Sequence, residues 1–343
     1  MNYQYTHSVN THSRQHGIGL VEIMIAMVLG LLLLNGVIQI FIANKQSYRT
    51  AEELGRMQEN TRYAMHMLAS DIRKAGYWGC ISMDSMTITN NLDSGGGINL
   101  DGSALEGTEG SSNSPDTITL RGAYSSGIRI TQQMPANSGR THTTENNGLQ
   151  IGDIIMISDC VTSDITQITG PSNADTLDGG QTVHNSGNTG VTPGNSTQSL
   201  SKSYSGDSSV FKAMQITYSI QTGAGGHPSL FKKINANAAE EIVEGVESLQ
   251  VLYGRDTDSD GVANLYTTAN NITGTQWDDV VSVRFGLLMR TIHEVASTTD
   301  TSSYTLAGAT INSSVHSQGK YQRYIAQSTI KLRNRGCGST YGC

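Results

Sequence analysis

The stretch that decides the fold is HGIGLVEIMIAMVLGLLLLNGVIQIFIA, residues 16–43. From Ile18 onward it holds 26 mostly apolar residues, enough to cross a hydrocarbon core of about 30 Å as a helix. Glu22 interrupts this run, and an ionisable group inside a membrane span is costly, so its first interpretation is functional. The alternative is an interfacial Glu22 that reaches water. That alternative requires a span beginning near Ile23 and leaves the apolar residues before Glu22 unexplained.

A cut between Gly17 and Ile18 would create an α-amino group four residues from the Glu22 carboxylate and so supply a partner for it. The pattern Gly17, then Ile-Gly-Leu-Val-Glu over residues 18–22, then an apolar helix, resembles the class III signal of type IV pilins and type II secretion pseudopilins. The resemblance implies that a prepilin peptidase removes residues 1–17 as a leader and N-methylates Ile18. It also implies that Glu22 guides docking into a filament. Ile18 departs from the Phe usual at the first mature position.

Other export signals fit this segment less well. A secretory signal needs a short apolar region followed by a small-residue cleavage site, whereas this run is too long and no such site follows it. The segment 18–43 is therefore expected to be a transmembrane or filament-core helix. The resemblance implies that it crosses the inner membrane once, with its N-terminus in the cytoplasm. Within it, Ala26 and Gly30 form a small-xxx-small pair that lets helices approach closely.

The helical pattern continues over residues 44–75 as an amphipathic segment. Its apolar or small positions share one arc of a helix: Leu54, Met57, Thr61, Ala64, Met65, Leu68, Ile72 and Ala75. Charged positions occupy the remainder: Arg49, Glu52, Glu53, Arg56, Glu59, Arg62, Arg73 and Lys74. Gly76 supplies a stop. This half is expected to bind a globular domain along one face.

Residues 76–343 read as a β-rich domain. The predicted strands are 117–120, 151–157, 211–220, 229–234, 247–252, 280–290 and 321–332, with polar surface loops over 82–114 and 170–209. The formal net charge of −7 does not indicate a basic, nucleic-acid-binding surface. The predicted fold is therefore α+β and type IV pilin-like, with a long N-terminal helix packed on an antiparallel β-rich domain.

Several segments of this domain, in their order, resemble those of PilW-type minor pilins, which are similar to the J-type minor pseudopilin of type II secretion. They are the segments 75–80, 152–160, 243–247, 249–254 and 332–335. The resemblance implies a low-abundance subunit that joins other minor pilins and a PilY-type adhesin in a tip complex that primes assembly of the major pilin. The implied location is the inner membrane first, then the periplasm and the pilus. Twitching motility, adhesion and DNA uptake are implied as processes.

Four cysteines, an even number, are consistent with two disulfides in an oxidising compartment, and they permit three pairings. Cys80–Cys160 together with Cys337–Cys343 is favoured, because the second pair closes a short loop. A metal site on these cysteines is disfavoured, since no C-x-x-C or Cys/His spacing occurs.

Residues 256–264, DTDSDGVAN, place oxygen ligands at the first, third, fifth and ninth positions of a calcium-loop pattern and Gly at the sixth. The candidate ligands are Asp256, Asp258, Asp260, Val262 and Asn264. The twelfth position is Thr267 rather than Glu, and no helices flank the loop, which excludes a helix–loop–helix module. A calcium-stabilised turn and an ordinary Asp/Gly-rich hairpin turn both remain open.

No other cofactor is required by the sequence, and none of its nine histidines lies in a catalytic motif, so an enzyme is not expected. Three interpretations remain: a minor pilin of the type IV pilus, a type II secretion minor pseudopilin, or a membrane-tethered calcium-dependent adhesion module.

Overall fold

The computed structural model describes residues 19–79, 87–100, 103–172, 177, 179–187 and 190–335, without the side chains of residues 125–126. The chain divides into two units, Met1–Glu52 and Glu53–Cys343. The cleavage site Gly17–Ile18 lies outside the described residues.

In the first unit, residues 20–52 belong to helix α1 (Leu20–Lys74). The carbonyl of Gly19 accepts the first helical hydrogen bonds, from the N–H groups of Glu22 (2.9 Å) and Ile23 (3.2 Å). The large apolar side chains from Leu20 to Ile42 are all exposed, Leu33 for example to 74%. By length and composition this is a helix that could span a membrane.

The described strands follow α1 in the second unit. Their bounds are β1 (Thr87–Asn90), β2 (Leu105–Thr108), β3 (Thr117–Gln132), β4 (Arg140–Thr143), β5 (Ile154–Ser158), β6 (Thr162–Gln167), β7 (Gln181–Val183), β8 (Ser209–Thr222), β9 (Pro228–Ile234), β10 (Glu240–Glu244), β11 (Val246–Arg255), β12 (Leu265–Thr267), β13 (Val280–Arg290), β14 (Tyr304–Leu306), β15 (Ala309–Ile311) and β16 (Arg323–Lys331). Short 3-10 helices are η2 (Gly95–Gly97), η3 (Ser111–Asn113), η4 (Ala269–Asn271) and η5 (Gly274–Asp279).

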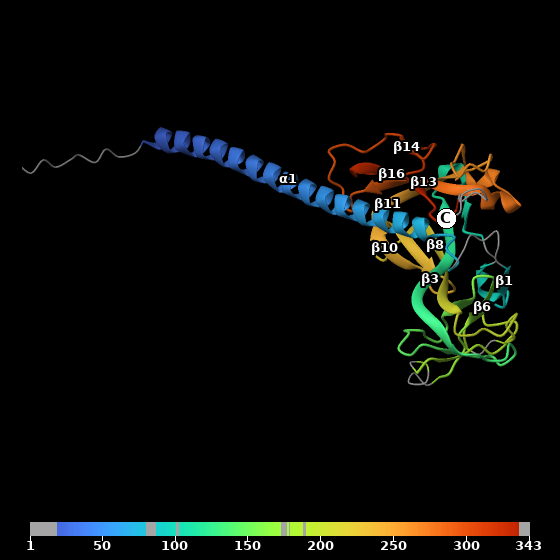
Figure 1. Cartoon of the computed structure of the whole chain (residues 1–343). Coiled ribbons are helices and arrows are strands. Elements are labelled where there is room, and N and C mark those ends of the chain that lie inside the picture. Colours follow the sequence, from blue (N-terminus) through green and yellow to red (C-terminus); the bar gives the residue numbers. More distant parts are fainter. Residues whose placement is uncertain are drawn as a thin grey trace, which may run out of the picture. The chain divides into compact units, whose positions relative to one another are not determined.

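These strands form a ten-stranded sheet, a four-stranded sheet and the two-stranded β14–β15 hairpin. The large sheet has the order β1-β6-β5-β8-β3-β4-β7; in addition, β2 pairs with β3, β9 pairs with β8, and β10 pairs with β9. The small sheet has the order β12-β11-β13-β16. The pairings are antiparallel except β1 with β6. Figure 1 shows the long strands β3 and β8 running from the region of β11 and β13 toward β1 and β6.

The main core lies where the C-terminal half of α1 meets both sheets. Met57, Leu68 and Ile72 of α1 are buried in one cluster with Tyr218 of β8 and Phe285 of β13. Each such side chain contributes about 1.5–3 kcal/mol by leaving water. The amphipathic pattern predicted for residues 44–75 therefore does bury its apolar arc, and α1 ends at Lys74, just before Gly76 (φ +75°).

The predicted α+β arrangement of a long apolar helix and an antiparallel β-rich region is confirmed. The predicted strand 280–290 coincides with β13, because its strict alternation leaves little ambiguity. The predicted strand 117–120 is much too short, since β3 continues to Gln132 through polar residues that pair with β8. Sequence alternation alone gives no reason to extend it.

The stretch 170–209 contains β7 and is tied to the large sheet by buried polar side chains. The carboxylate of Asp164 on β6 accepts hydrogen bonds from the Ser201 N–H (3.0 Å) and the Tyr204 hydroxyl (2.7 Å). The side-chain amide of Asn195 accepts from the Gln167 N–H (2.7 Å) and donates to the Gln167 carbonyl (2.8 Å), as a strand partner would. These directional bonds order a segment that has few apolar residues.

Candidate functional site

The exposed apolar half of α1 is the first candidate site. Glu22 is exposed in the first turn of the helix, where a negative charge is favoured by the helix dipole. Ala26 and Gly30 are four residues apart and share a face. A Cβ placed on Gly30 would meet nothing within 4 Å, so that face is open to another helix. The roles predicted for Glu22, Ala26 and Gly30 stay predictions.

Two buried acids of α1 bind the β-rich domain within the second unit. One is Glu53, which the helical pattern placed on the polar face, and that placement is wrong: Glu53 is 8% exposed. Its Oε2 accepts hydrogen bonds from the N–H groups of Ile292 (3.0 Å) and His293 (3.1 Å), and its Oε1 lies 2.9 Å from His293 Nδ1. Burial raises the pKa of Glu53, but these bonds to His293 and Ile292 outweigh it and leave the pKa below 4.5. A carboxylate that accepts this many hydrogen bonds can be buried. The spacing of apolar residues along a helix does not predict such bonds.

The second buried acid is Asp71, which sequence reasoning missed. One of its oxygens, Oδ2, lies 2.7 Å from both the Tyr218 hydroxyl and Lys232 Nζ. The ammonium group also lies over the Tyr218 ring, 5.6 Å from its centroid. The only sign of burial in the sequence is that Asp71 directly precedes the apolar Ile72. The partners of Asp71 are about 150 residues away along the chain.

The C-terminal end of α1 is capped by the residues that follow β16. The Arg333 N–H donates to the Arg73 carbonyl (3.4 Å), and the Asn334 side-chain amide donates to the Lys74 carbonyl (3.3 Å). These bonds satisfy carbonyls that a helix end leaves without intrahelical partners. The segment 332–335, singled out from the sequence only by resemblance, thus has a structural role at the end of α1.

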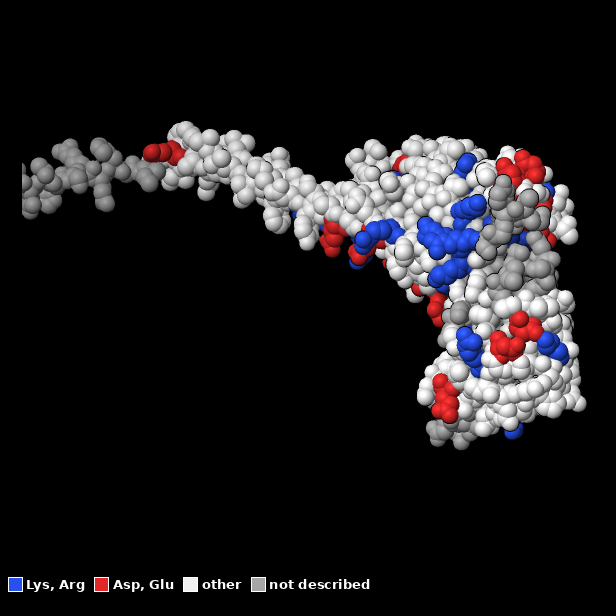
Figure 2. Space-filling model, in the orientation of Figure 1, with Lys and Arg blue, Asp and Glu red and all other residues white. Residues whose placement is uncertain are grey.

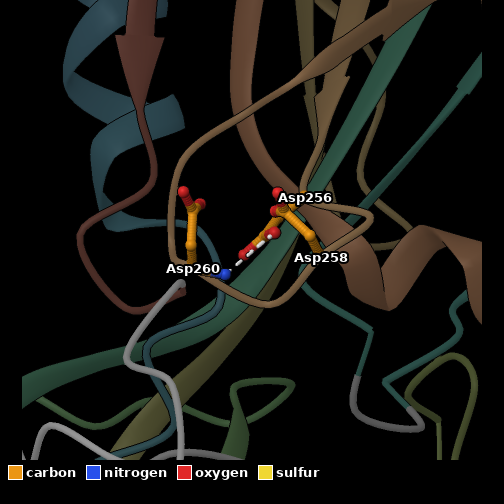
Figure 3. A group of neighbouring side chains, drawn as sticks. All are labelled: Asp256, Asp258 and Asp260. Atoms are coloured by element: carbon orange, nitrogen blue, oxygen red, sulfur yellow. Dashed lines mark hydrogen bonds between the residues drawn. The ribbon is translucent and has the colours of Figure 1, made fainter.

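The aspartates of the predicted calcium loop lie in the turn between β11 and β12, and Figure 3 shows their side chains. One carboxylate oxygen from each of Asp256, Asp258 and Asp260 can lie within 4.8 Å of the others. Asp256 also orders the turn, because it accepts hydrogen bonds from the N–H groups of Ser259 (2.7 Å) and Gly261 (2.7 Å). Desolvation raises the pKa of Asp256, but hydrogen bonds, first that from Gly261, outweigh it and lower the pKa.

The other two predicted ligands are engaged within the turn. The Asn264 Oδ1 accepts from the Thr257 N–H (3.0 Å), and the Val262 N–H donates to Asp260 Oδ1 (2.7 Å). The ligand atoms that the structure brings together are oxygens of the three carboxylates, a chemistry that suits a hard cation such as Ca²⁺.

The disulfide predictions fall largely outside the described residues. Cys160 is disulfide-bonded. Cys80, Cys337 and Cys343 lie outside the described residues, so the predicted pairs Cys80–Cys160 and Cys337–Cys343 stay predictions.

An exposed apolar helix that continues into a helix packed on an antiparallel β-rich domain defines a pilin-like α+β protein. Residues 217–334 match the family PilW, described as Type IV Pilus-assembly protein W, and over these residues the resemblance to PilW is confirmed. The matched residues run from β8 through β16 to the α1 cap at Asn334. The family's described role is pilus assembly, which is structural rather than catalytic. No curated protein matches the chain.

Proposed function

We propose that this protein is a minor pilin of the type IV pilus, a low-abundance subunit that joins other minor pilins and a PilY-type adhesin in a tip complex that primes assembly of the major pilin. One observation carries the proposal. The apolar half of α1 is exposed all round, in a chain whose residues 217–334 match a pilus-assembly family. Such a surface needs a bilayer or a bundle of like helices around it.

In this proposal a prepilin peptidase cuts between Gly17 and Ile18 and methylates the new amine. The mature protein resides in the inner membrane with its β-rich domain in the periplasm, and is then incorporated into the pilus. The carboxylate of Glu22 pairs with the N-terminal amine of its own or a neighbouring subunit. That pairing removes the cost of a lone charge in an apolar environment.

The intact mass of the purified protein tests the processing step. We expect a chain that begins at N-methylated Ile18. Replacing Gly17 with Phe should leave the leader in place, while Gly19→Ala serves as the matched control and should be processed. Normal mature mass in Gly17→Phe would contradict a class III signal.

Incorporation into pili tests the role of Glu22. The isosteric Glu22→Gln variant should insert in the membrane and yet be lost from sheared pili, because the counter-charge is gone. Glu52→Gln, which changes an exposed acid of the same helix outside the apolar run, should be incorporated like the parent. Equal incorporation of both variants would make Glu22 an interfacial residue.

Two related interpretations have distinct signatures. A type II secretion minor pseudopilin would be processed in the same way but would co-purify with secretion pseudopilins instead of pilus subunits. A membrane-tethered calcium-dependent adhesion module would not need cleavage at Gly17. The match to a pilus-assembly family favours the minor pilin over both.

We further propose that Asp256, Asp258 and Asp260 bind Ca²⁺ weakly, which supports the β11–β12 turn. The convergence of three carboxylates within 4.8 Å favours this, because a cation relieves their mutual repulsion. Without a bidentate Glu at the twelfth position, we expect a Kd of about 10⁻⁴–10⁻³ M.

A further inference from the structure

The last strand, β16, is an edge strand of the four-stranded sheet, and among the described strands it forms ladder hydrogen bonds only with β13. The Leu332 N–H donates to the Val281 carbonyl (2.9 Å), which continues the β13–β16 register by one residue. In an antiparallel ladder the bonded residues alternate. The N–H and C=O groups of Thr329 and Lys331 therefore point away from β13, and the structure describes no backbone partner for them.

A pocket of about 420 Å³ lies at this end of the edge and opens to solvent. It is lined by Thr329 to Arg333, by Arg335, and by Arg73 from the last turn of α1. Figure 2 shows basic side chains gathered on this face of the β-rich domain. The pocket thus combines a free backbone edge with a local excess of positive charge, in a chain whose net charge is −7.

The cations of the pocket differ in what they already bind. Arg335 forms an ion pair with Asp278 (3.1 Å), and Lys331 Nζ donates to the Gly261 carbonyl (2.9 Å). Among the described residues, neither guanidinium group of Arg73 and Arg333 has a hydrogen bond or an ion pair. Arg73 also complements the helix dipole, so charge alone does not define a site here. The free strand edge beside it is the independent feature.

We propose that this pocket, which we call the β16 edge pocket, binds an acidic extended segment of another protein by strand addition. The segment's main chain would pair with Thr329 and Lys331, and its carboxylates would be held by Arg73 and Arg333. Guanidinium groups bind carboxylates in a two-pronged geometry, and an edge strand pairs with any extended peptide.

A peptide fits this edge better than a nucleic acid does. The edge offers both N–H donors and C=O acceptors, which a peptide main chain satisfies together, whereas a phosphodiester backbone offers acceptors only. The chain's net negative charge also opposes a long polyanion. We take this other protein to be another pilus subunit, an assignment that rests on the proposed function; the chemistry of the β16 edge pocket does not depend on it.

The test uses the full chain in detergent micelles and fluorescence anisotropy of labelled probes. The probes are a short peptide of alternating valine and glutamate, the same peptide with lysine in place of glutamate, and a DNA duplex. Of the three probes, we expect only the glutamate peptide to bind. Arg333→Glu should weaken its binding roughly tenfold to a hundredfold, because a charge-assisted hydrogen bond is lost and a repulsion is introduced.

Two further variants separate the charge from the strand edge. Arg56→Glu makes the same change of charge at an exposed position of α1, about 25 Å from Arg73 along the helix. This variant should bind the glutamate peptide like the parent. Thr329→Pro removes one outward N–H while leaving all the cations, and should weaken binding several-fold. Near-ultraviolet circular dichroism checks that each variant is folded.

Unchanged affinity in both Arg333→Glu and Thr329→Pro, or no binding of the glutamate peptide, would overturn the proposal. Tighter binding of the DNA duplex, lost in Arg333→Glu, would also overturn it by assigning the pocket to phosphate. The intact mass of the same preparations reports cleavage after Gly17 independently, so failure of the β16 edge pocket and failure of the minor-pilin proposal are distinguishable.

Discussion

Removing the Asp71 carboxylate should destabilise the β-rich domain more than any other single polar change on α1. The Asp71 side chain is 11% exposed and its partner Lys232 is 15% exposed, and the two atoms in contact are 2.7 Å apart. The Tyr218 hydroxyl donates to the same oxygen. In Asp71→Ala, a largely buried ammonium group and a buried hydroxyl both lose their acceptor.

Breaking a buried ion pair from one side costs about 3–5 kcal/mol. Because Lys232 keeps some access to water, we expect the lower end, about 3 kcal/mol, for Asp71→Ala. Asp71→Asn keeps an acceptor for Tyr218 and loses the charge, so we expect about 2 kcal/mol. The double variant Asp71→Asn/Lys232→Met should be more stable than the sum of its single changes by at least about 1 kcal/mol, since no unpaired charge remains.

Urea unfolding of the full chain in detergent micelles measures these differences through the fluorescence of Trp78 and Trp277, which both lie in the second unit. Glu59→Ala, at an exposed position of the same helix, is the control and should lie within about 0.5 kcal/mol of the parent. If Asp71→Ala also lies within that margin, the reasoning that Asp71 anchors α1 to β8 and β9 is refuted.

The remaining predictions concern pH, calcium and backbone conformation. Because folding lowers the pKa of Glu53, its ionised carboxylate stabilises the fold above the ordinary pKa of 4.5, and this stabilisation is lost as the pH falls through the folded pKa. Glu53→Gln should therefore lower the free energy of unfolding by about 1 kcal/mol at neutral pH, and urea unfolding should show a smaller difference in acid. Millimolar Ca²⁺ should raise the melting temperature of the parent relative to a sample with chelator, and should leave the melting temperature of Asp258→Ala unchanged. If calcium changes the melting temperature of neither protein, the turn is an ordinary hydrophilic one. Gly245→Ala should cost about 1–3 kcal/mol more than Gly148→Ala, because both glycines have positive φ but only at Gly245 would the new Cβ lie 2.7 Å from the Arg290 carbonyl oxygen; equal unfolding midpoints would contradict that contact.

The features that were predictable from the sequence are those with a single strong physical cause. A run of 26 mostly apolar residues has to be a helix wherever it is removed from water, and the alternation of Val281, Val283 and Phe285 fits only a strand. The Asp256 turn was also predictable in outline, because three acids and a glycine close together favour a tight loop. What it binds depends on side-chain directions that spacing alone does not give.

The features that were not predictable depend on partners distant in the chain. The charge of Glu53 fits the polar arc of the helix, yet its Oε2 accepts hydrogen bonds from the N–H groups of Ile292 and His293, 239 and 240 residues later. The length of β3 similarly depends on β8, and the β16 edge pocket exists only because β16 comes last in its sheet. A one-dimensional pattern contains no information about which strand is the edge.

The two buried acids of α1 set the register of the helix on its domain. Apolar contacts such as those of Leu68 tolerate a shift of a helix by one turn, because the next apolar residue replaces the last. Glu53 and Asp71 lie 18 residues, or five turns, apart, and each needs its own donors, so a one-turn shift would leave two carboxylates and Lys232 unpaired at once. These polar contacts therefore fix how the C-terminal half of α1 lies along the β-rich domain.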